Sequence, residues 1–235
     1  MLIHTVFDLL AWTTAGLVGR WIGSLKWLAA SGPRRTPFTE PYYFIMLGLG
    51  AMAGAILFGS INLGLAGFSV PGHSMAGALL GGIVAVEIYK WRNGVRRSTG
   101  LAFVAPLAAG IAVGRVGCFL AGLPDYSYGT PTALPVGVDF GDGLRRHPVQ
   151  LYESAAMLAF LAVYLRELAR GSPLFLRQGF YLFVGWYGVQ RFAWEFLKPY
   201  PKLFGPFNLF HILCVAMLAY SVVMIGRNRE RHPAV

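Results

Sequence analysis

The sequence contains little charge for its length. Only 13% of its 235 residues are Asp, Glu, Lys or Arg, whereas soluble domains usually contain about 25%. Hydrophobic residues make up 56% of the chain, and the mean hydropathy is positive. A chain with so few charges cannot cover a folded surface with polar groups. The composition therefore predicts an all-α integral membrane protein and excludes a typical soluble enzyme.

Cysteine is scarce, and acidic residues are half as numerous as basic ones. The two cysteines, Cys118 and Cys214, lie in apolar runs and provide neither a metal-ligand spacing nor a disulfide framework. The net charge of +10 comes from Lys and Arg in short connections that lack the interleaved aromatic residues of a nucleic-acid surface. We therefore expect no metal site, no cofactor and no nucleic-acid partner.

Long apolar runs dominate what is present. Each is close to the roughly 20 residues that cross a bilayer as a helix. For the first run, which contains His4, Asp8 and Arg20, a helix lying in the interface is an alternative. We predict one polytopic domain over 1–235, with a compact structured loop at about 123–147, where Gly, Pro and Asp are frequent. The seven predicted transmembrane helices are 2–23, 42–63, 74–90, 101–122, 148–167, 178–197 and 207–226.

Basic residues are distributed unequally between the two sets of connections. The odd-numbered connections and the C-terminal tail carry 14 Lys and Arg, among them Lys26, Arg34 and Arg35, and the even-numbered connections carry four. Cytoplasmic connections of membrane proteins are enriched in Lys and Arg. The distribution therefore predicts an N-terminus outside and a C-terminus in the cytoplasm.

Two arginines lie inside apolar runs at matching depths. Arg115 lies about 14 residues into the fourth run, which at 1.5 Å per residue is about 21 Å from its inner end. Arg191 lies at a similar depth in the sixth run, and Glu195 is one helical turn further out. A charge near the bilayer centre costs at least about 2.5 kcal/mol, so such groups usually serve a function.

Further polar residues reach the same outer level. His73 lies at the mouth of the third run, and Arg146, His147, Tyr152 and Glu153 lie at or just inside the mouth of the fifth, which Pro148 opens. In one interpretation these groups are structural, with Arg191 paired to Glu195 and Arg115 paired to Glu153. In the other, they line a polar cavity for an anion, because the planar fork of arginine binds two phosphate oxygens at once. At this depth the anion would be a phospholipid headgroup.

His73 is the best candidate base, because a neutral imidazole accepts a proton near neutral pH. A histidine at a helix mouth is also often a satisfied surface residue, and His4, His147 and His211 share that ambiguity.

These residues fall in motifs that resemble those of the prolipoprotein diacylglyceryl transferase family, and the resemblance covers most of the chain. The glycine-arginine signature appears as GRVGCF, the RHPxQLYE segment as RHPVQLYE, and the tyrosine-arginine-glutamate helix as YGVQRFAWEF. The family histidine is similar to His73 in GHSMAGALLGG. The residues that match are His73, Gly114, Arg115, Gly117, Gly129, Arg146, His147, Gln150, Tyr152, Glu153, Tyr187, Arg191 and Glu195.

The resemblance implies a transferase of the bacterial inner membrane with its site near the periplasmic face. Such an enzyme moves the diacylglyceryl group of phosphatidylglycerol to the lipobox cysteine of a prolipoprotein signal peptide, and glycerol phosphate leaves. By this resemblance Arg115 and Arg191 hold the phosphate, His73 helps to deprotonate the thiol and Glu195 orients Arg191. The remaining residues, including Arg146, Tyr152 and Tyr187, shape the headgroup site, and no metal is required.

The chain also departs from the family pattern. Cys118 and Ala121 stand where the signature has asparagines, and Asp125 is at best a displaced form of its acidic residue. Cys118 follows Arg115 by three residues and is either a nucleophile or a small buried apolar residue. A relative that uses phosphatidylglycerol with another acceptor is therefore an alternative. A phospholipid-binding or flipping protein, which needs the arginines but not His73, is a second alternative, and a proton-coupled transporter is a weaker third.

Overall fold

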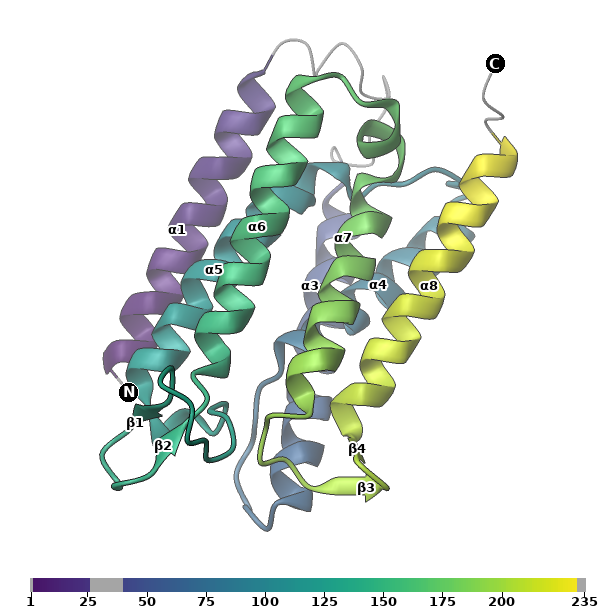
Figure 1. Cartoon of the computed structure of the whole chain (residues 1–235). Coiled ribbons are helices and arrows are strands. Elements are labelled where there is room, and N and C mark those ends of the chain that lie inside the picture. Colours follow the sequence, from purple (N-terminus) through teal and green to yellow (C-terminus); the bar gives the residue numbers. More distant parts are fainter. Residues whose placement is uncertain (1, 26–39, 232–235) are drawn as a thin grey trace. The chain divides into compact units, whose positions relative to one another are not determined.

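The computed structural model describes residues 2–25 and 40–231, and these contain seven α-helices (Figure 1). Each helix coincides with one of the predicted apolar runs. The connection that carries Lys26, Arg34 and Arg35 lies outside the described residues. The helices are α1 (Leu2–Ser24), α3 (Pro41–Leu65), α4 (Met75–Arg92), α5 (Val104–Ala121), α6 (Val149–Ala169), α7 (Pro173–Glu195) and α8 (Leu209–Arg231).

Within the described residues, three helical stretches are long and apolar enough to cross a membrane: Pro41–Leu65, Leu101–Ala121 and Leu209–Asn228. The chain is thus mostly helical with three candidate spans, while the count of seven spans and the orientation of the termini remain predictions. Two expected boundaries were wrong. Helix α7 begins at Pro173 rather than 178, because proline fits the first helical turn. Pro148 is the residue before α6 rather than its first residue.

The chain divides into two compact units. The first comprises Met1–Gly32 and Gly100–Pro199, and the second comprises Pro33–Thr99 and Tyr200–Val235. The prediction of a single domain over 1–235 therefore stays a prediction.

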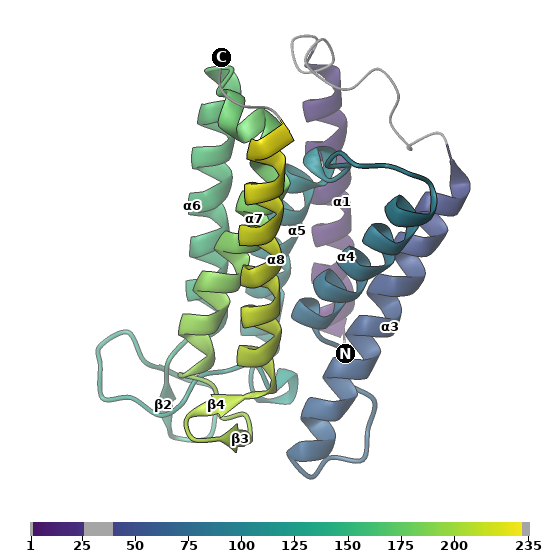
Figure 2. The ribbon, with the colours of Figure 1, turned by 90° about the vertical axis from the view of Figure 1, so that its right-hand side faces the viewer.

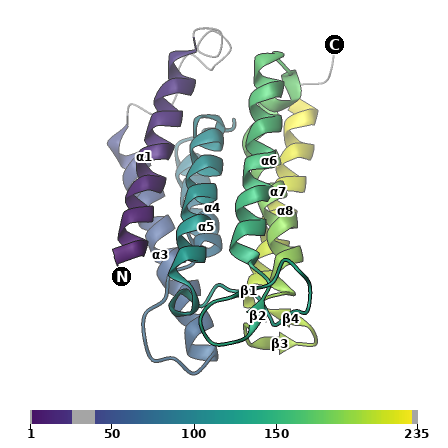
Figure 3. The same ribbon diagram turned by 60° about the vertical axis from the view of Figure 1, so that its left-hand side comes forward.

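In the first unit the helices pack in the order α1, α5, α6 and α7 (Figure 3). Small residues of α5 allow α1 to approach closely. A Cβ atom on Gly117 would lie 2.3 Å from the Cβ of Phe7, so only glycine permits this contact. On the opposite face of α5, the Ser154 hydroxyl of α6 donates to the carbonyl of Ala112 at 2.8 Å. Helix α5 is therefore held between α1 and α6, with its arginine facing α6.

The connection between α5 and α6 covers the predicted loop at 123–147. It contains a short 3₁₀ turn (Leu123–Asp125) and an antiparallel pair, β1 (Val138–Asp139) with β2 (Arg145–Arg146). The Asp139 carboxylate accepts hydrogen bonds from the backbone N–H groups of three residues in the turn, 141, 142 and 143. Gly141 and Gly143 have φ angles of 101° and 76°, in the region that favours glycine. The turn therefore brings the chain back to the start of α6.

In the second unit, glycines allow α3 and α4 to pack with their backbones in contact (Figure 2). A Cβ on Gly54 would lie 2.2 Å from the carbonyl oxygen of Gly77, and one on Gly50 would lie 2.6 Å from that of Gly81. Such small-residue interfaces are typical of membrane helices. A Cβ on Gly59 would lie 2.5 Å from the backbone nitrogen of His73, so the same packing fixes the chain just before α4.

The second unit also contains α8, which packs on α4. The Tyr220 hydroxyl of α8 donates to Glu87 at 2.8 Å, and Lys90 donates to the same carboxylate oxygen at 2.7 Å. A short antiparallel pair, β3 (Lys202–Phe204) with β4 (Phe207–Asn208), precedes α8.

Candidate phosphate-binding site

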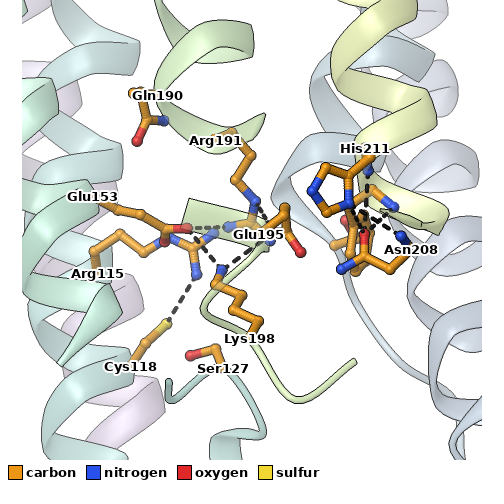
Figure 4. Close-up of polar contacts among 12 residues, drawn as sticks. Arg115, Cys118, Ser127, Glu153, Gln190, Arg191, Glu195, Lys198, Asn208 and His211 are labelled. Atoms are coloured by element: carbon orange, nitrogen blue, oxygen red, sulfur yellow. Dashed lines mark hydrogen bonds and ion pairs between the residues drawn. The ribbon is translucent and has the colours of Figure 1, made fainter. Parts of the chain in front are cut away.

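The centre of the site is the carboxylate of Glu153, in the second turn of α6. One of its oxygens lies 2.7 Å from Nε of Arg115 on α5, and the other lies 2.6 Å from Nη1 of Arg191 on α7. Figure 4 shows the two guanidinium groups converging on this carboxylate from different helices. The two arginines that matched in depth along the sequence therefore meet in one place.

Two further charges complete the cluster. Glu195 lies one turn beyond Arg191 on α7, and its carboxylate lies 2.6 Å from Nε of Arg191. Lys198, in the turn that follows α7, places Nζ 2.7 Å from Glu153 and 3.4 Å from Glu195. Both ion pairs expected in the structural interpretation are thus present, joined by a lysine that sequence reasoning missed. Its signal was the spacing of three residues from Glu195.

All five charged side chains are buried. The exposed fractions are 9% for Arg115, 3% for Arg191, 1% for Lys198, 1% for Glu153 and 0% for Glu195. Three cations face two carboxylates, so the cluster carries one net positive charge. Buried charges are costly unless they are paired, and an excess cation needs an anion for full compensation. The arrangement therefore suits a monoanionic ligand.

Cys118 lies at the edge of this cluster, one turn after Arg115 on α5. Its sulfur is 4.0 Å from Nη1 of Arg115. The Asp125 carboxylate accepts a hydrogen bond from Ser127 and lies 3.3 Å from Nε2 of His4. Cys118 therefore contacts the arginine, while Asp125 forms a separate polar group with His4 and Ser127.

The remaining loop residues lie around the start of α6. Arg146 pairs with Asp142 at 2.6 Å, and its guanidinium carbon lies 5.2 Å from the centre of the Tyr128 ring. This hydrogen bond holds the pKa of the Asp142 carboxyl below its usual value. Arg146 therefore stabilises the loop in this structure, and its guanidinium does not enter the Glu153 cluster.

His147 and Gly129 connect the loop to α6. The His147 ring nitrogen Nδ1 lies 3.3 Å from the Tyr152 hydroxyl. The Gly129 N–H donates to the carbonyl of His147 at 3.0 Å, and a Cβ on Gly129 would lie 2.5 Å from that oxygen. Gly129 is therefore a position of close backbone approach.

Three other predicted residues lie on the helices of the cluster. Gln150 is 0% exposed and one turn before Glu153 on α6, and Tyr187 is 1% exposed and one turn before Arg191 on α7. Gly114 precedes Arg115 on α5, where a Cβ would lie 3.9 Å from that of Ala11.

His73 belongs to the second unit, so its role as a base stays a prediction. Its side chain is exposed, and the next residue, Ser74, caps α4 by accepting a hydrogen bond from the N–H of Gly77 at 3.1 Å. His211, in the same unit, is buried and its Nδ1 lies 3.0 Å from the Asn208 side-chain oxygen (Figure 4). Among the described residues, no group of three or more His, Cys, Asp and Glu could hold a metal ion.

Comparison with known proteins places these residues in a family context. A model of the family described as prolipoprotein diacylglyceryl transferase matches residues 4–227. The chain is 33% identical to the phosphatidylglycerol–prolipoprotein diacylglyceryl transferase of Aromatoleum aromaticum, over 97% of this chain and 98% of that protein. It is 35% identical to the protein of the same name from Nitratidesulfovibrio vulgaris strain DP4, over 89% of this chain and 84% of the relative. No solved structure matches the chain significantly.

Proposed function

The chain belongs to the prolipoprotein diacylglyceryl transferase family, and we propose that it transfers the diacylglyceryl group of phosphatidylglycerol to a lipobox cysteine. The acceptor is the thiol of that cysteine in a prolipoprotein signal peptide, and glycerol phosphate is the second product. The proposed location is the inner membrane, with the site near its periplasmic face.

The observation that carries this proposal is the net positive charge of the buried cluster. Phosphatidylglycerol has one phosphodiester charge, which balances the single excess charge of Arg115, Arg191, Lys198, Glu153 and Glu195. A guanidinium has five N–H donors, and this number exceeds what a single carboxylate can accept. Each arginine can therefore keep its carboxylate and also donate to a phosphate oxygen.

The same charge would favour the chemical step. The acceptor thiolate attacks the terminal glyceryl carbon that bears the phosphate, a C–S bond forms, and the C–O bond to phosphate breaks. The electron pair stays on the phosphate oxygen, so the leaving glycerol phosphate gains a second negative charge. Arg115 and Arg191 are placed to stabilise this charge as it develops, because fixed donors in a buried site are most effective at that point.

The other roles follow from the same chemistry. The thiol proton must be removed because the thiolate is the nucleophile, and His73 is the proposed acceptor of that proton. The carboxylates of Glu153 and Glu195 fix the two guanidinium planes, at 2.6–2.7 Å. Tyr152, Tyr187, Gln150, His147 and the loop around Gly129 and Arg146 would enclose the headgroup, and Gly114 and Cys118 would border it.

The test is a transfer assay with purified protein. Phosphatidylglycerol labelled in its diacylglyceryl part is mixed with a lipobox peptide, and a peptide with Ser in place of Cys is the control. We expect label on the cysteine peptide only, with an equal amount of glycerol phosphate. Arg191→Lys should lower the rate at least about 100-fold, since lysine lacks the planar fork. Arg170→Gln, which removes an exposed cation paired to Glu167, is the matched control and should keep the rate.

Two results would contradict the proposal. Glycerol phosphate release without labelled peptide would indicate a different acceptor. Because Cys118 and Asp125 depart from the family pattern, the assay should then be repeated with a lipid acceptor and with water as the acceptor. Lipid binding without turnover by wild type and by His73→Ala alike would indicate a binding or flipping protein.

A further inference from the structure

The loop at 123–147 presents an apolar tip that the described part of the protein leaves uncovered. The tip is the segment 131–137, and its residues 133–136, with the sequence Ala-Leu-Pro-Val, are all exposed. Leu134 and Val136 are each 54% exposed. Single exposed apolar residues are common on protein surfaces, but a run of four is unusual unless it serves a function. The tip therefore needs an apolar partner.

Arg145 fixes the backbone of this tip. Its Nη2 donates to the carbonyl of Pro135 at 2.8 Å and to that of Gly137 at 3.0 Å, and its Nε donates to the Gly137 carbonyl at 3.1 Å. The Gly137 N–H donates to the carbonyl of Leu134 at 3.0 Å and closes a turn. A Cβ on Gly137 would lie 2.9 Å from the Thr132 side chain, so the two ends of the tip are in contact. The apolar side chains are therefore carried by a defined turn.

The hydrogen bonds of the tip suit an apolar environment. At its centre, 134–137, the carbonyls of Leu134, Pro135 and Gly137 all accept hydrogen bonds from within the loop. The Leu134 N–H donates to the Thr132 hydroxyl at 3.2 Å, and proline has no N–H. Only Val136 keeps a backbone N–H and a carbonyl without a hydrogen bond in this described segment. Backbone groups that meet lipid must be bonded within the protein, and this turn nearly fulfils that condition.

The loop also starts close to a membrane surface. The stretch Leu101–Ala121 is one of the candidate spans, and the loop begins two residues after it. Figure 2 shows part of the loop extending past the side of α6, beyond the end of that helix. The loop is therefore placed to reach lipid headgroups beside α6.

We propose that the tip docks on the lipid surface beside α6, with Leu134 and Val136 inserted at the boundary between headgroups and acyl chains. Interfacial segments combine apolar side chains with cations in this way, because cations pair with anionic headgroups. Arg145 supplies the cation. Its Nη1 has no hydrogen bond among the described residues, so it can donate to a lipid phosphate while Nε and Nη2 hold the turn.

A lipid surface fits the tip better than a polypeptide partner does. Interfaces between proteins have closely packed centres that are enriched in aromatic residues. The tip contains no aromatic residue, and its side chains are small or aliphatic. A lipid surface requires no complementary shape. The charge distribution of the sequence predicts that this surface is the outer leaflet.

The test measures the depth of the tip in a bilayer. Leu134→Cys and Val136→Cys, each in a background with Cys118→Ala and Cys214→Ala, are labelled with a nitroxide and placed in nanodiscs of phosphatidylcholine and phosphatidylglycerol. Electron paramagnetic resonance then compares collisions with oxygen, which enters acyl chains, and with a nickel complex, which stays in water. We expect both labels about 5–10 Å below the lipid phosphates.

Two controls separate docking from general exposure. The same label at Asp142→Cys, in the exposed polar turn of the same loop, should stay in water. Arg145→Gln leaves the carbonyls of Pro135 and Gly137 without their donor, so the label at Leu134→Cys should move to the water side of the phosphates. Arg170→Gln removes an exposed cation from the other end of α6 and should leave the depth unchanged.

Tip labels that collide with the nickel complex as often as the Asp142→Cys label would overturn the proposal. Labels that are shielded from both reagents only after a lipobox peptide is added would also overturn it, because the tip would then bind a polypeptide. The depth is measured without turnover. A protein that fails to transfer the diacylglyceryl group would therefore refute the proposed function and leave this test intact.

Discussion

Replacing Glu153 with glutamine should destabilise the first unit more than any other single charge removal. The substitution keeps the shape of the side chain but removes ion pairs of 2.7, 2.6 and 2.7 Å to Arg115, Arg191 and Lys198. The net charge of the buried cluster rises from one to two. Removing one partner of a buried ion pair costs about 3–5 kcal/mol, because the remaining charge stays buried. For a chain of this size that corresponds to a fall in Tm of roughly 10 °C.

The measurement is thermal unfolding of the purified protein in a detergent without phosphorus, followed by tryptophan fluorescence. Glu167→Gln is the control, since this carboxylate pairs with an exposed Arg170 at 3.1 Å and its loss should cost less than about 1 kcal/mol. Combining Glu153→Gln with Lys198→Met returns the cluster to one net charge and should recover part of the lost stability. A Glu153→Gln variant with the Tm of the control would refute Glu153 as the centre of the cluster.

Two further predictions concern the other parts of the structure. Gly54→Ala should lower Tm by several degrees, because the new Cβ would lie 2.2 Å from the Gly77 carbonyl oxygen and overpacking costs about 1–3 kcal/mol. Gly48→Ala is the control: its Cβ would meet nothing within 4 Å, so Tm should not fall. The Asp142–Arg146 ion pair should stabilise the loop fully above the unfolded pKa of aspartate, near 4, and this stabilisation should be lost as the pH falls through the lowered pKa of Asp142 in the folded protein. Amide hydrogen exchange of the loop as a function of pH measures this stabilisation. An Asp142→Asn variant with the same pH profile as wild type would contradict the prediction.

The meeting of Arg115 and Arg191 could be predicted from the sequence because both arginines lie in apolar runs that are predicted to cross the membrane in the same direction. A rise of 1.5 Å per residue then gives similar depths, and the cost of burying charge gives a reason for them to share one ligand. The Arg191–Glu195 pair followed from the same helical geometry at a spacing of four residues.

Lys198 could not be assigned to the site in this way. It follows the end of an apolar run and reads as an ordinary cation of an exposed connection, while its burial depends on how the turn after α7 folds back toward Glu153. For Arg146 the error runs in the opposite direction. Its motif predicted a place in the headgroup site, but in the structure its guanidinium pairs with Asp142 in the loop. The exposed apolar tip of that loop is likewise a property of packing, which no spacing of residues records.

The most direct test asks whether one lipid phosphate touches both arginines. Protein with ¹⁵N-labelled arginine is mixed with one equivalent of phosphatidylglycerol in a detergent without phosphorus, frozen, and examined by ³¹P–¹⁵N dipolar recoupling in solid-state NMR. We expect the phosphate to dephase guanidinium nitrogens in wild type, less so in Arg115→Lys and in Arg191→Lys, and not at all in the double variant. Dephasing that persists in the double variant, or that only one of the two substitutions reduces, would contradict a phosphate held between Arg115 and Arg191.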